Sequence, residues 1–266
     1  MSTAEAEVAR PSLLSQVLEW RVFGEAYASL WSYPLLKQAP RGDGQPVLVL
    51  PGFLAGEAST YVLRQFLKSL GYRAHTWKLG RNLGPIGEKE HDIHERLKEL
   101  SRRYKRKISI VGWSLGGVYA RELAWLDTDL VRQVITLGTP IRHPNSITVS
   151  WLYEDVTGQR ERHMSPELLA RVPEPPPVPS TCIYSRSDGV VPWQCSVEKP
   201  SRLTENIRVE GSHLGMGFHP AVLWAIADRL AQPEGRWRKF KAPPYTSLLY
   251  PRPDKFATKA RARTKG

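Results

Sequence analysis

The sequence contains little cysteine and no long apolar run, and both absences narrow the kinds of protein it can be. Its 266 residues include only two cysteines, Cys182 and Cys195, too few for the disulfide framework of a small secreted domain. We therefore expect two unbridged, partly buried thiols. No stretch approaches the roughly eighteen apolar residues of a membrane-spanning helix, and residues 1–10 lack the apolar centre of a secretory signal. These absences predict a soluble, cytoplasmic protein.

The sequence also lacks a DNA- or RNA-binding motif, even though its net charge is +12. The charge is concentrated at the C-terminus. Residues 236–266 contain ten basic residues and one acidic residue, so they carry nine of the net positive charges. We expect a basic C-terminal tail that is partly disordered, with no specific nucleic-acid partner. Weak contact with an anionic membrane is the alternative role for this tail.

What the sequence does contain is a regular alternation of short apolar runs and helical patterns, with 41% hydrophobic residues to build a core. The run 47–50 is apolar throughout, which is typical of a strand buried on both faces, as in a parallel sheet. The fold class is therefore α/β: a doubly wound, mainly parallel sheet of about six strands with helices on both faces. We expect the strands at residues 47–50, 73–79, 108–112, 131–137, 181–184 and 206–209.

The pattern divides the chain into a catalytic domain, 41–235, and two flanking parts. Within the domain, residues 141–179 have no strand signal and end in a run of prolines, so they are a candidate cap or lid. Residues 1–40 are expected to form amphipathic helices that break near Gly24, end before Pro34, and pack on the core or the active-site rim. Their aromatic residues also suit a lid or a membrane-touching element. The residues concerned are Leu13, Leu14, Val17, Leu18, Trp20, Phe23, Tyr27, Leu30 and Trp31.

The strongest local signal is a serine between two glycines, Gly112-Trp113-Ser114-Leu115-Gly116. It lies where an apolar run breaks into a helical pattern, which predicts a strand, a sharp turn and a helix with Ser114 at the apex. Glycines two residues on either side relieve crowding in so tight a turn. Ser114 is then pushed out at the carboxyl edge of the sheet in a strained backbone, and we expect it to be a nucleophile.

A serine hydroxyl needs a base, and seven histidines compete for that role. His213 follows the last predicted strand and precedes the last helix, where a loop returns over the strand ends, so we favour it. His219 is its nearest rival, but Pro220 after it indicates a helix start. His75 lies inside a strand, while His143 and His163 lie in the predicted insertion.

The third group is a carboxylate that orients the base, and Asp188 is our candidate. It follows the strand at 181–184, between the serine and the histidine in chain order. Asp127 and Asp129 are the alternatives. They lie at the far end of the helix that starts beside Ser114, which is the wrong edge of the sheet.

Two backbone N–H groups are expected to form an oxyanion hole. Leu115, at a helix N-terminus directly after the nucleophile, supplies one, and Phe53, in the loop after the first strand, supplies the other. The side chains in or beside these loops are expected to contact substrate, namely Leu54, Asn82, Trp113 and Val190. His91 and His94 have the spacing of a metal pair, but their flanks are charged and no further ligands converge on them. No metal and no cofactor are predicted.

Taken together, these motifs resemble those of the α/β-hydrolase superfamily. Within that superfamily, they resemble the lipases and esterases. The order serine, acid, histidine matches, whereas the oxyanion loop departs from the family by starting Pro51-Gly52-Phe53 where many members begin His-Gly. The resemblance covers about residues 45–231. The matching motifs are Gly112-Trp113-Ser114-Leu115-Gly116-Gly117, Thr136-Leu137-Gly138-Thr139-Pro140, Ser187-Asp188-Gly189-Val190-Val191-Pro192 and Gly211-Ser212-His213.

The resulting hypothesis is a serine hydrolase that cleaves carboxylic esters of hydrophobic acyl groups, small-molecule or lipid, through an acyl-enzyme on Ser114. The same triad would serve an acyltransferase or a thioesterase, and a non-catalytic binding protein on this fold is a further alternative. Dehalogenase chemistry is disfavoured because it needs a carboxylate at the position of Ser114.

Overall fold

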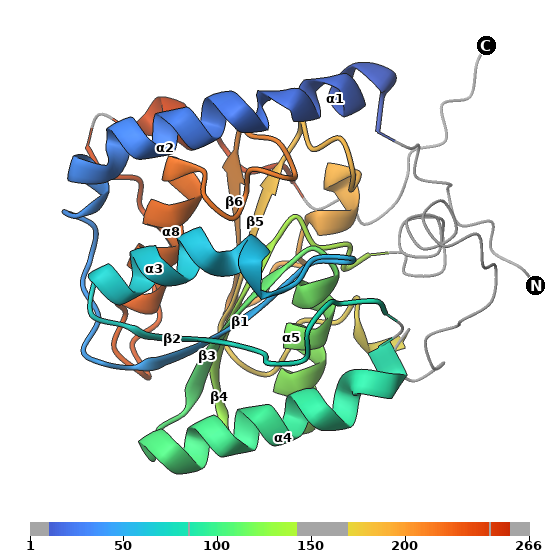
Figure 1. Ribbon diagram of the computed structural model, residues 1–266, viewed down its shortest axis with the longest axis vertical. Coiled ribbons are helices and arrows are strands. Elements are labelled where there is room, and N and C mark those ends of the chain that lie inside the picture. The colour runs from blue at the N-terminus through green and yellow to red at the C-terminus, as the bar shows by residue number, and fades with distance from the viewer. Residues whose placement is uncertain (1–10, 85, 143–169, 245, 256–266) are drawn as a thin grey trace, which may run out of the picture.

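The centre of the protein is a sheet of six strands, all parallel, in the order β2-β1-β3-β4-β5-β6 (Figure 1). The computed structural model describes residues 11–84, 86–142, 170–244 and 246–255. Every residue of β1, β3 and β5 is buried, as a strand covered by helices on both faces requires. The strands are β1 Pro46–Leu50, β2 Arg73–Thr76, β3 Ile108–Trp113, β4 Val131–Leu137, β5 Ser180–Ser185 and β6 Thr204–Val209.

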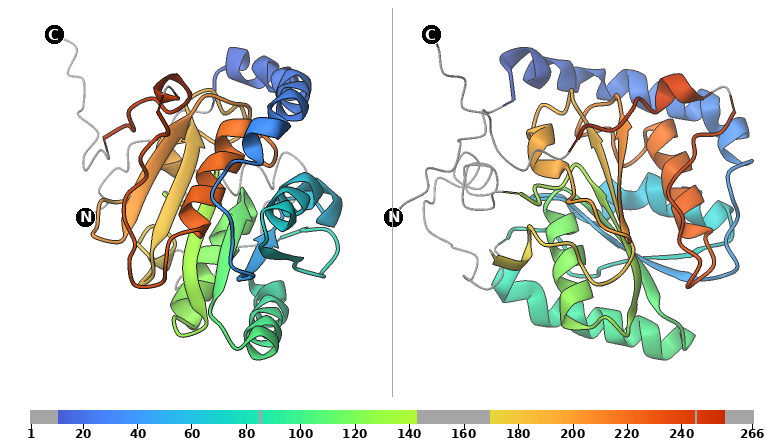
Figure 2. Two further views of the ribbon diagram at one scale, coloured as in Figure 1. Left: turned by 90° about the vertical axis from the view of Figure 1, so that its left-hand side faces the viewer. Right: turned by 180° about the vertical axis from the view of Figure 1, so that it is seen from behind.

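Helices cover both faces of this sheet, and each face has its own hydrophobic core. One core joins the sheet to α3 and α8 and includes Leu63, Phe66 and Ile226. The other joins it to α4 and α5 and includes Leu97, Val118 and Leu123. This confirms the predicted fold class, and Figure 2 shows the layers from two further sides. The helices are α3 Tyr61–Ser69, α4 Ile86–Tyr104, α5 Leu115–Leu126 and α8 Pro220–Leu230, with short turns η2 Glu57–Thr60, η3 Trp193–Ser196 and η4 Ser247–Leu249.

The chain reverses its direction of winding between β1 and β3, because β2 lies on one side of β1 and all later strands lie on the other. In an open parallel sheet, a ligand site forms at the carboxyl ends of the two strands beside such a switch point. The loop that follows β1 and the turn that follows β3 meet there. This topology places Phe53 and Ser114 at one edge of the sheet.

The N-terminal segment forms one nearly continuous helical rod, α1 Leu13–Val17, η1 Leu18–Arg21 and α2 Val22–Leu36. It crosses the carboxyl ends of β5 and β6 (Figure 1). The predicted break near Gly24 and the predicted end before Pro34 are both wrong, since α2 includes both residues. Proline has no N–H for the helical bond to the carbonyl of Leu30 and its ring crowds that carbonyl, so α2 accommodates Pro34 at a cost in stability. The irregularity lies earlier, in the 3-10 turn η1.

Part of the predicted basic tail packs against the body of the protein. Tyr250 donates a hydrogen bond to the carbonyl of Ala221 over 2.9 Å. Asp254 accepts one from the hydroxyl of Tyr184 over 2.9 Å and pairs with Arg186. Residues up to 255 therefore cover β5 and α8. The rest of the tail, 256–266, and residues 143–169 of the predicted insertion lie outside the described residues.

Cys182 and Cys195 form no disulfide and both are buried, as predicted; burial raises the pKa of the Cys182 thiol to about 12. Within the described ranges, every helix is too short or too polar to cross a membrane.

Candidate functional site

Ser114 occupies the turn between the last residue of β3 and the first residue of α5. Its φ of +51° is a left-handed conformation that a residue with a side chain adopts only under strain. A hydrogen bond to the neighbouring strand holds the turn: the N–H of Ser114 donates to the carbonyl of Leu137, at the end of β4, over 2.8 Å. The serine is 4% exposed. The strained backbone inferred from the sequence is present.

The two flanking glycines are required by close packing. A Cβ atom at Gly112 would collide with the backbone of Gly116 and Gly117, and one at Gly116 would lie 2.5 Å from the carbonyl oxygen of Leu50. No side chain fits at either position. Gly112 and Gly116 are thus required by crowding in the turn, as predicted from the sequence.

The predicted acid and base contact each other. Asp188 Oδ2 lies 2.7 Å from His213 Nδ1, and both side chains are almost fully buried. The other carboxylate oxygen, Oδ1, accepts hydrogen bonds from the N–H groups of Val190 and Val191 over 2.8 and 2.7 Å. The two backbone bonds fix the carboxylate, and the carboxylate holds the proton of the neutral imidazole on Nδ1. Nε2 is then the nitrogen that can accept a proton.

The end of β4 connects this pair to the serine turn. Gly138 directly follows the residue that binds Ser114, and its φ is +51°. A Cβ atom there would lie 2.9 Å from both Asp188 Oδ2 and His213 Nδ1. From the other side, the indole Nε1 of Trp113 donates to the carbonyl of His213 over 3.2 Å. The structure therefore brings the serine, acid and base predicted from the sequence to one edge of the sheet.

The charge balance at His213 favours its protonated form. Burial alone would lower the pKa of this histidine, but the charge of Asp188, the hydrogen bond to it and the charge of Glu19 together raise the pKa above its ordinary value. A buried imidazolium would be stabilised there. That is the state a general base reaches after it has taken a proton.

The competing residues have other partners. His219 is the N-cap of α8, where its Nδ1 accepts the N–H of Ala221 over 3.3 Å. Asp127 contacts His94 at 3.2 Å, at the far end of α5. The carboxylate of Asp188 is paired with His213 instead, so neither competitor takes part in that pair.

The backbone of residues 51–55 lies directly against the serine. A Cβ atom at Gly52 would be 3.2 Å from the Cβ of Ser114. Leu115 is the first residue of α5, so its N–H has no partner within the helix. Phe53 lies in the same loop as Gly52, beside Leu54, whose φ is +58°.

Asn82 holds this loop in place. It is fully buried, and its side-chain Nδ2 donates to the backbone carbonyl of Pro51 over 2.9 Å. Its backbone carbonyl accepts the N–H of Leu54 over 2.7 Å. We predicted from the sequence that Asn82 contacts substrate. Because its amide is engaged within the protein, its structural role is to shape the loop. Of the other predicted contact residues, Trp113 is 8% exposed, Leu54 is 39% exposed and Val190 is half-buried.

Two carboxylates at the site were missed by sequence reasoning. Glu19 in η1 and Glu25 in α2 reach the loops that carry Asp188 and His213. In the sequence they are distinguished only by their place on the helical face opposite the apolar residues.

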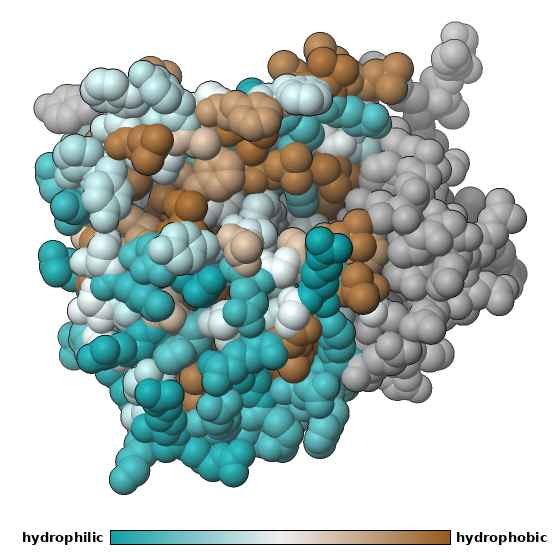
Figure 3. Space-filling view, in the orientation of Figure 1, coloured by the Kyte–Doolittle hydropathy of each residue, from teal (hydrophilic) through white to brown (hydrophobic). Residues whose placement is uncertain are grey.

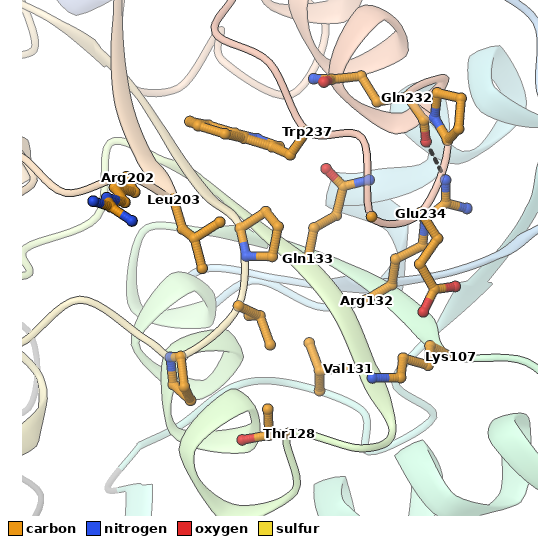
Figure 4. A pocket seen from close by; sticks show the side chains of 15 residues that line it. Lys107, Thr128, Val131, Arg132, Gln133, Arg202, Leu203, Gln232, Glu234 and Trp237 are labelled. Atoms are coloured by element: carbon orange, nitrogen blue, oxygen red, sulfur yellow. Dashed lines mark hydrogen bonds between the residues drawn. The ribbon is translucent and has the colours of Figure 1, made fainter.

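A cavity of about 390 Å³ lies elsewhere in the molecule (Figure 4). It is lined by residues at the amino ends of β4, β5 and β6, such as Val131, Pro179 and Leu203. Parallel strands place their carboxyl ends at the opposite edge, so this cavity is remote from Ser114. In the part of the chain that the structure describes, no three His, Cys, Asp or Glu residues gather in a way that could hold a metal ion.

Comparison with known proteins supports the fold assignment. No protein-family model matches the sequence, and neither does any curated protein. Among solved structures, the chain is similar to lipase B of Aspergillus fumigatus, with a TM-score of 0.57 and 18% identity over 73% of this chain and 54% of the lipase. It is also similar to the lipase BlEst2 of Bacillus licheniformis, with a TM-score of 0.51 and 14% identity over 68% and 90%. This chain thus spans about half the length of the first of these lipases. It has the α/β-hydrolase fold of lipases and esterases.

Proposed function

We propose that the protein is a serine hydrolase that cleaves carboxylic esters of hydrophobic acyl groups through an acyl-enzyme on Ser114. The single observation that carries the proposal is the contact of 2.7 Å between Asp188 and His213, at the edge where Ser114 sits in a strained turn. The similarity in fold to two lipases is consistent with it.

The mechanism follows from the atoms that meet at this edge. The Oγ of Ser114 attacks the acyl carbonyl carbon while His213 Nε2 takes the hydroxyl proton of Ser114. The negative charge that forms on the carbonyl oxygen is stabilised by the N–H groups of Leu115 and Phe53. His213 then gives the proton to the departing alcohol oxygen. Water, activated in the same way by His213, cleaves the acyl-enzyme and restores Ser114.

The preference for a hydrophobic acyl group rests on the side chains beside the serine. Leu54 and Val190 are apolar residues in the loops after β1 and β5, and Trp113 is the last residue of β3. Leu54, which is 39% exposed, and the half-buried Val190 are the apolar side chains that an acyl chain could contact here.

The test of this proposal is covalent labelling with a fluorophosphonate, followed by an ester panel from acetyl to long acyl. The wild type should label and should hydrolyse the longer esters faster, while Ser114→Ala should do neither. Absence of labelling in a folded wild type would overturn the proposal. Adding an alcohol or thiol acceptor to the assay separates hydrolysis from acyl transfer, and acyl-thioester substrates identify a thioesterase.

The helical rod of residues 13–36 adds a proposal about where the substrate is met. Eight of its large apolar residues are each 62% to 79% exposed, and we call them the apolar stripe: Leu13, Leu14, Val17, Trp20, Phe23, Tyr27, Leu30 and Trp31. Most of the face turned toward the body of the protein is instead small or polar, with Val22 half-buried and Leu36 joining the core at the end of α2. The rod is therefore amphipathic in the reverse sense, with its apolar face toward solvent. Figure 3 shows hydrophobic side chains gathered in the upper part of the molecule, where α1 and α2 run, above a hydrophilic lower half.

We propose that the apolar stripe docks on a lipid–water interface. Tryptophan and tyrosine favour that boundary because their rings are apolar with one polar atom. Large apolar side chains gathered on one exposed face are typical of an interaction surface. The same rod crosses the carboxyl ends of β5 and β6, so docking would bring lipid esters to the edge that holds Ser114.

Flotation with zwitterionic and anionic vesicles tests the stripe. A variant with Trp20→Ser, Phe23→Ser and Trp31→Ser should lose vesicle binding yet still hydrolyse a water-soluble short ester. Stronger binding to anionic vesicles would indicate that the basic tail assists. Vesicle binding that survives the substitutions would contradict the proposal. The proposal would also be contradicted if the wild type did not bind vesicles but formed concentration-dependent dimers that the substitutions abolish.

A further inference from the structure

Glu19 ties together the two loops that carry the acid and the base. Its Oε1 accepts the N–H of Gly189 and the N–H of His213, each over 2.8 Å. Its Oε2 accepts the N–H of Leu214 over 3.0 Å. Gly189 directly follows Asp188, so one carboxylate holds the backbone of both catalytic loops. Only 9% of the residue is exposed.

Neighbouring residues of the rod hold the same two loops from the side. Glu25 accepts the N–H of Ser212 over 2.7 Å and the hydroxyl of Ser212 over 2.5 Å. Arg21 pairs with Glu25 at 3.3 Å and donates to the carbonyl and the hydroxyl of Ser187 over 3.0 and 2.7 Å. The residues on either side of Asp188 and of His213 are therefore all bound by the rod.

The loops are shaped to receive the rod. A Cβ atom at Gly189 would collide with the backbone of Ser15, and one at Gly215 would collide with the carboxylate of Glu25. Glycine at these two positions lets the rod approach closely enough for its carboxylates to reach backbone N–H groups. The close packing extends along more than one turn of the rod.

Glu19 also brings a buried negative charge to the base. The ionisable groups around the His213 loop fall into two sets. Asp188 and Glu19 act on His213 and raise its pKa against the effect of burial. Glu25 and Arg21 instead act on His219, which lies beside Gly211. Glu210 is the remaining carboxylate here, and it contacts Arg208 and the hydroxyl of Ser187.

We propose that Glu19 is a positioning residue for the triad, a second carboxylate that fixes the loops of Asp188 and His213 relative to each other and stabilises the charged imidazole. The inference rests on the proposed function, since it concerns the same acid and base. Glu19 would act through the backbone of the two loops, without contact with the reacting atoms.

The decisive comparison is Glu19→Gln with Glu25→Gln as its matched control, since both remove a carboxylate that binds the His213 loop. For Glu19→Gln we expect kcat to fall about tenfold to a hundredfold with little change in KM, because small misplacements of catalytic groups cost that much. The acid limb of its kcat/KM profile should also move to lower pH, since the pKa of His213 loses one of the charges that raise it. Glu25→Gln should keep the acid limb of the wild type.

Glu19→Asp keeps the test decisive if the glutamine variant does not fold. The shorter side chain retains the charge but cannot reach all three N–H groups, so kcat should fall while the acid limb stays in place. A folded Glu19→Gln or Glu19→Asp with the kcat and pH profile of the wild type would overturn the inference. Failure of the wild type itself to label with fluorophosphonate would instead overturn the proposed function, so the two failures are distinguishable.

Discussion

The two carboxylate oxygens of Asp188 have different partners: Oδ2 lies 2.7 Å from His213 Nδ1, and Oδ1 accepts the backbone N–H groups of Val190 and Val191. The two backbone bonds keep the acid in place without help from its partner. The contact with His213 keeps the histidine ring in one orientation and one tautomer.

Replacing Asp188 by asparagine should therefore damage catalysis far more than folding. The amide preserves the size of the side chain, but it stabilises the wrong tautomer of the histidine, which costs about 10⁴-fold in kcat in serine hydrolases with this geometry. Steady-state kinetics on a short ester measure the loss, and circular dichroism controls for folding. A kcat within tenfold of the wild type would show that Asp188 is not the acid.

The pH profile should have an acid limb set by His213. The base works only when neutral, and its pKa is raised, so kcat/KM should fall as pH drops through a value above the ordinary 6.5. Rates measured from pH 5 to 9 at constant ionic strength locate the limb. Removing the charge of Asp188 should move it to lower pH. A rate that is independent of pH over this range would contradict the assignment of the base.

Gly138→Ala should reduce activity strongly. The new methyl group would lie 2.9 Å from both Asp188 Oδ2 and His213 Nδ1, and the φ of +51° is strained for alanine. We expect a loss of stability of about 1–3 kcal/mol together with the loss of turnover.

Gly24→Ala is the matched control for that substitution. It lies within α2, and a Cβ atom there would meet nothing within 4 Å. It should raise stability by about 0.5–1 kcal/mol and leave turnover unchanged. Equal effects of the two alanines on kcat would argue against a special role for the space at Gly138.

Breaking the buried ion pair between Arg121 and Glu198 should be strongly destabilising. Both side chains are almost completely buried, and Arg121 also donates to the carbonyl of Val172 over 3.0 Å. Arg121→Met should cost about 3–5 kcal/mol, because it leaves a buried carboxylate without its cation. The exposed pair Arg106–Asp43 is the comparison, and its loss should cost less than about 1 kcal/mol. Urea unfolding measures both.

The fold and the serine turn could be predicted from the sequence because their signals are local. Short apolar runs between turn residues, such as Val47–Leu50, favour a strand buried on both faces, and Gly112 and Gly116 mark the crowded turn around Ser114. The choice of His213 and Asp188 needed only chain order and the rule that parallel strands end at one edge. Whether these residues catalyse a reaction is a prediction for the experiments above.

The roles of Glu19 and Asn82 could not be predicted, because they depend on which backbone groups lie opposite once the chain has folded. Asn82 was interpreted as a substrate contact, yet its amide is used by Pro51. The apolar residues of the rod suggested an ordinary amphipathic helix, and periodicity alone does not tell which face meets the core. Pro34 was interpreted as a helix end, yet α2 continues past it to Leu36.

The bond from Glu19 to the backbone of His213 joins positions 194 residues apart. Such a contact is among the last that a growing chain can form, since the segment emerging early from the ribosome must wait for the final strand and its loop. If the bond is needed for turnover, a partly synthesised chain holds its serine in an incomplete site. Ester cleavage would then begin only after translation has passed the last strand of the sheet.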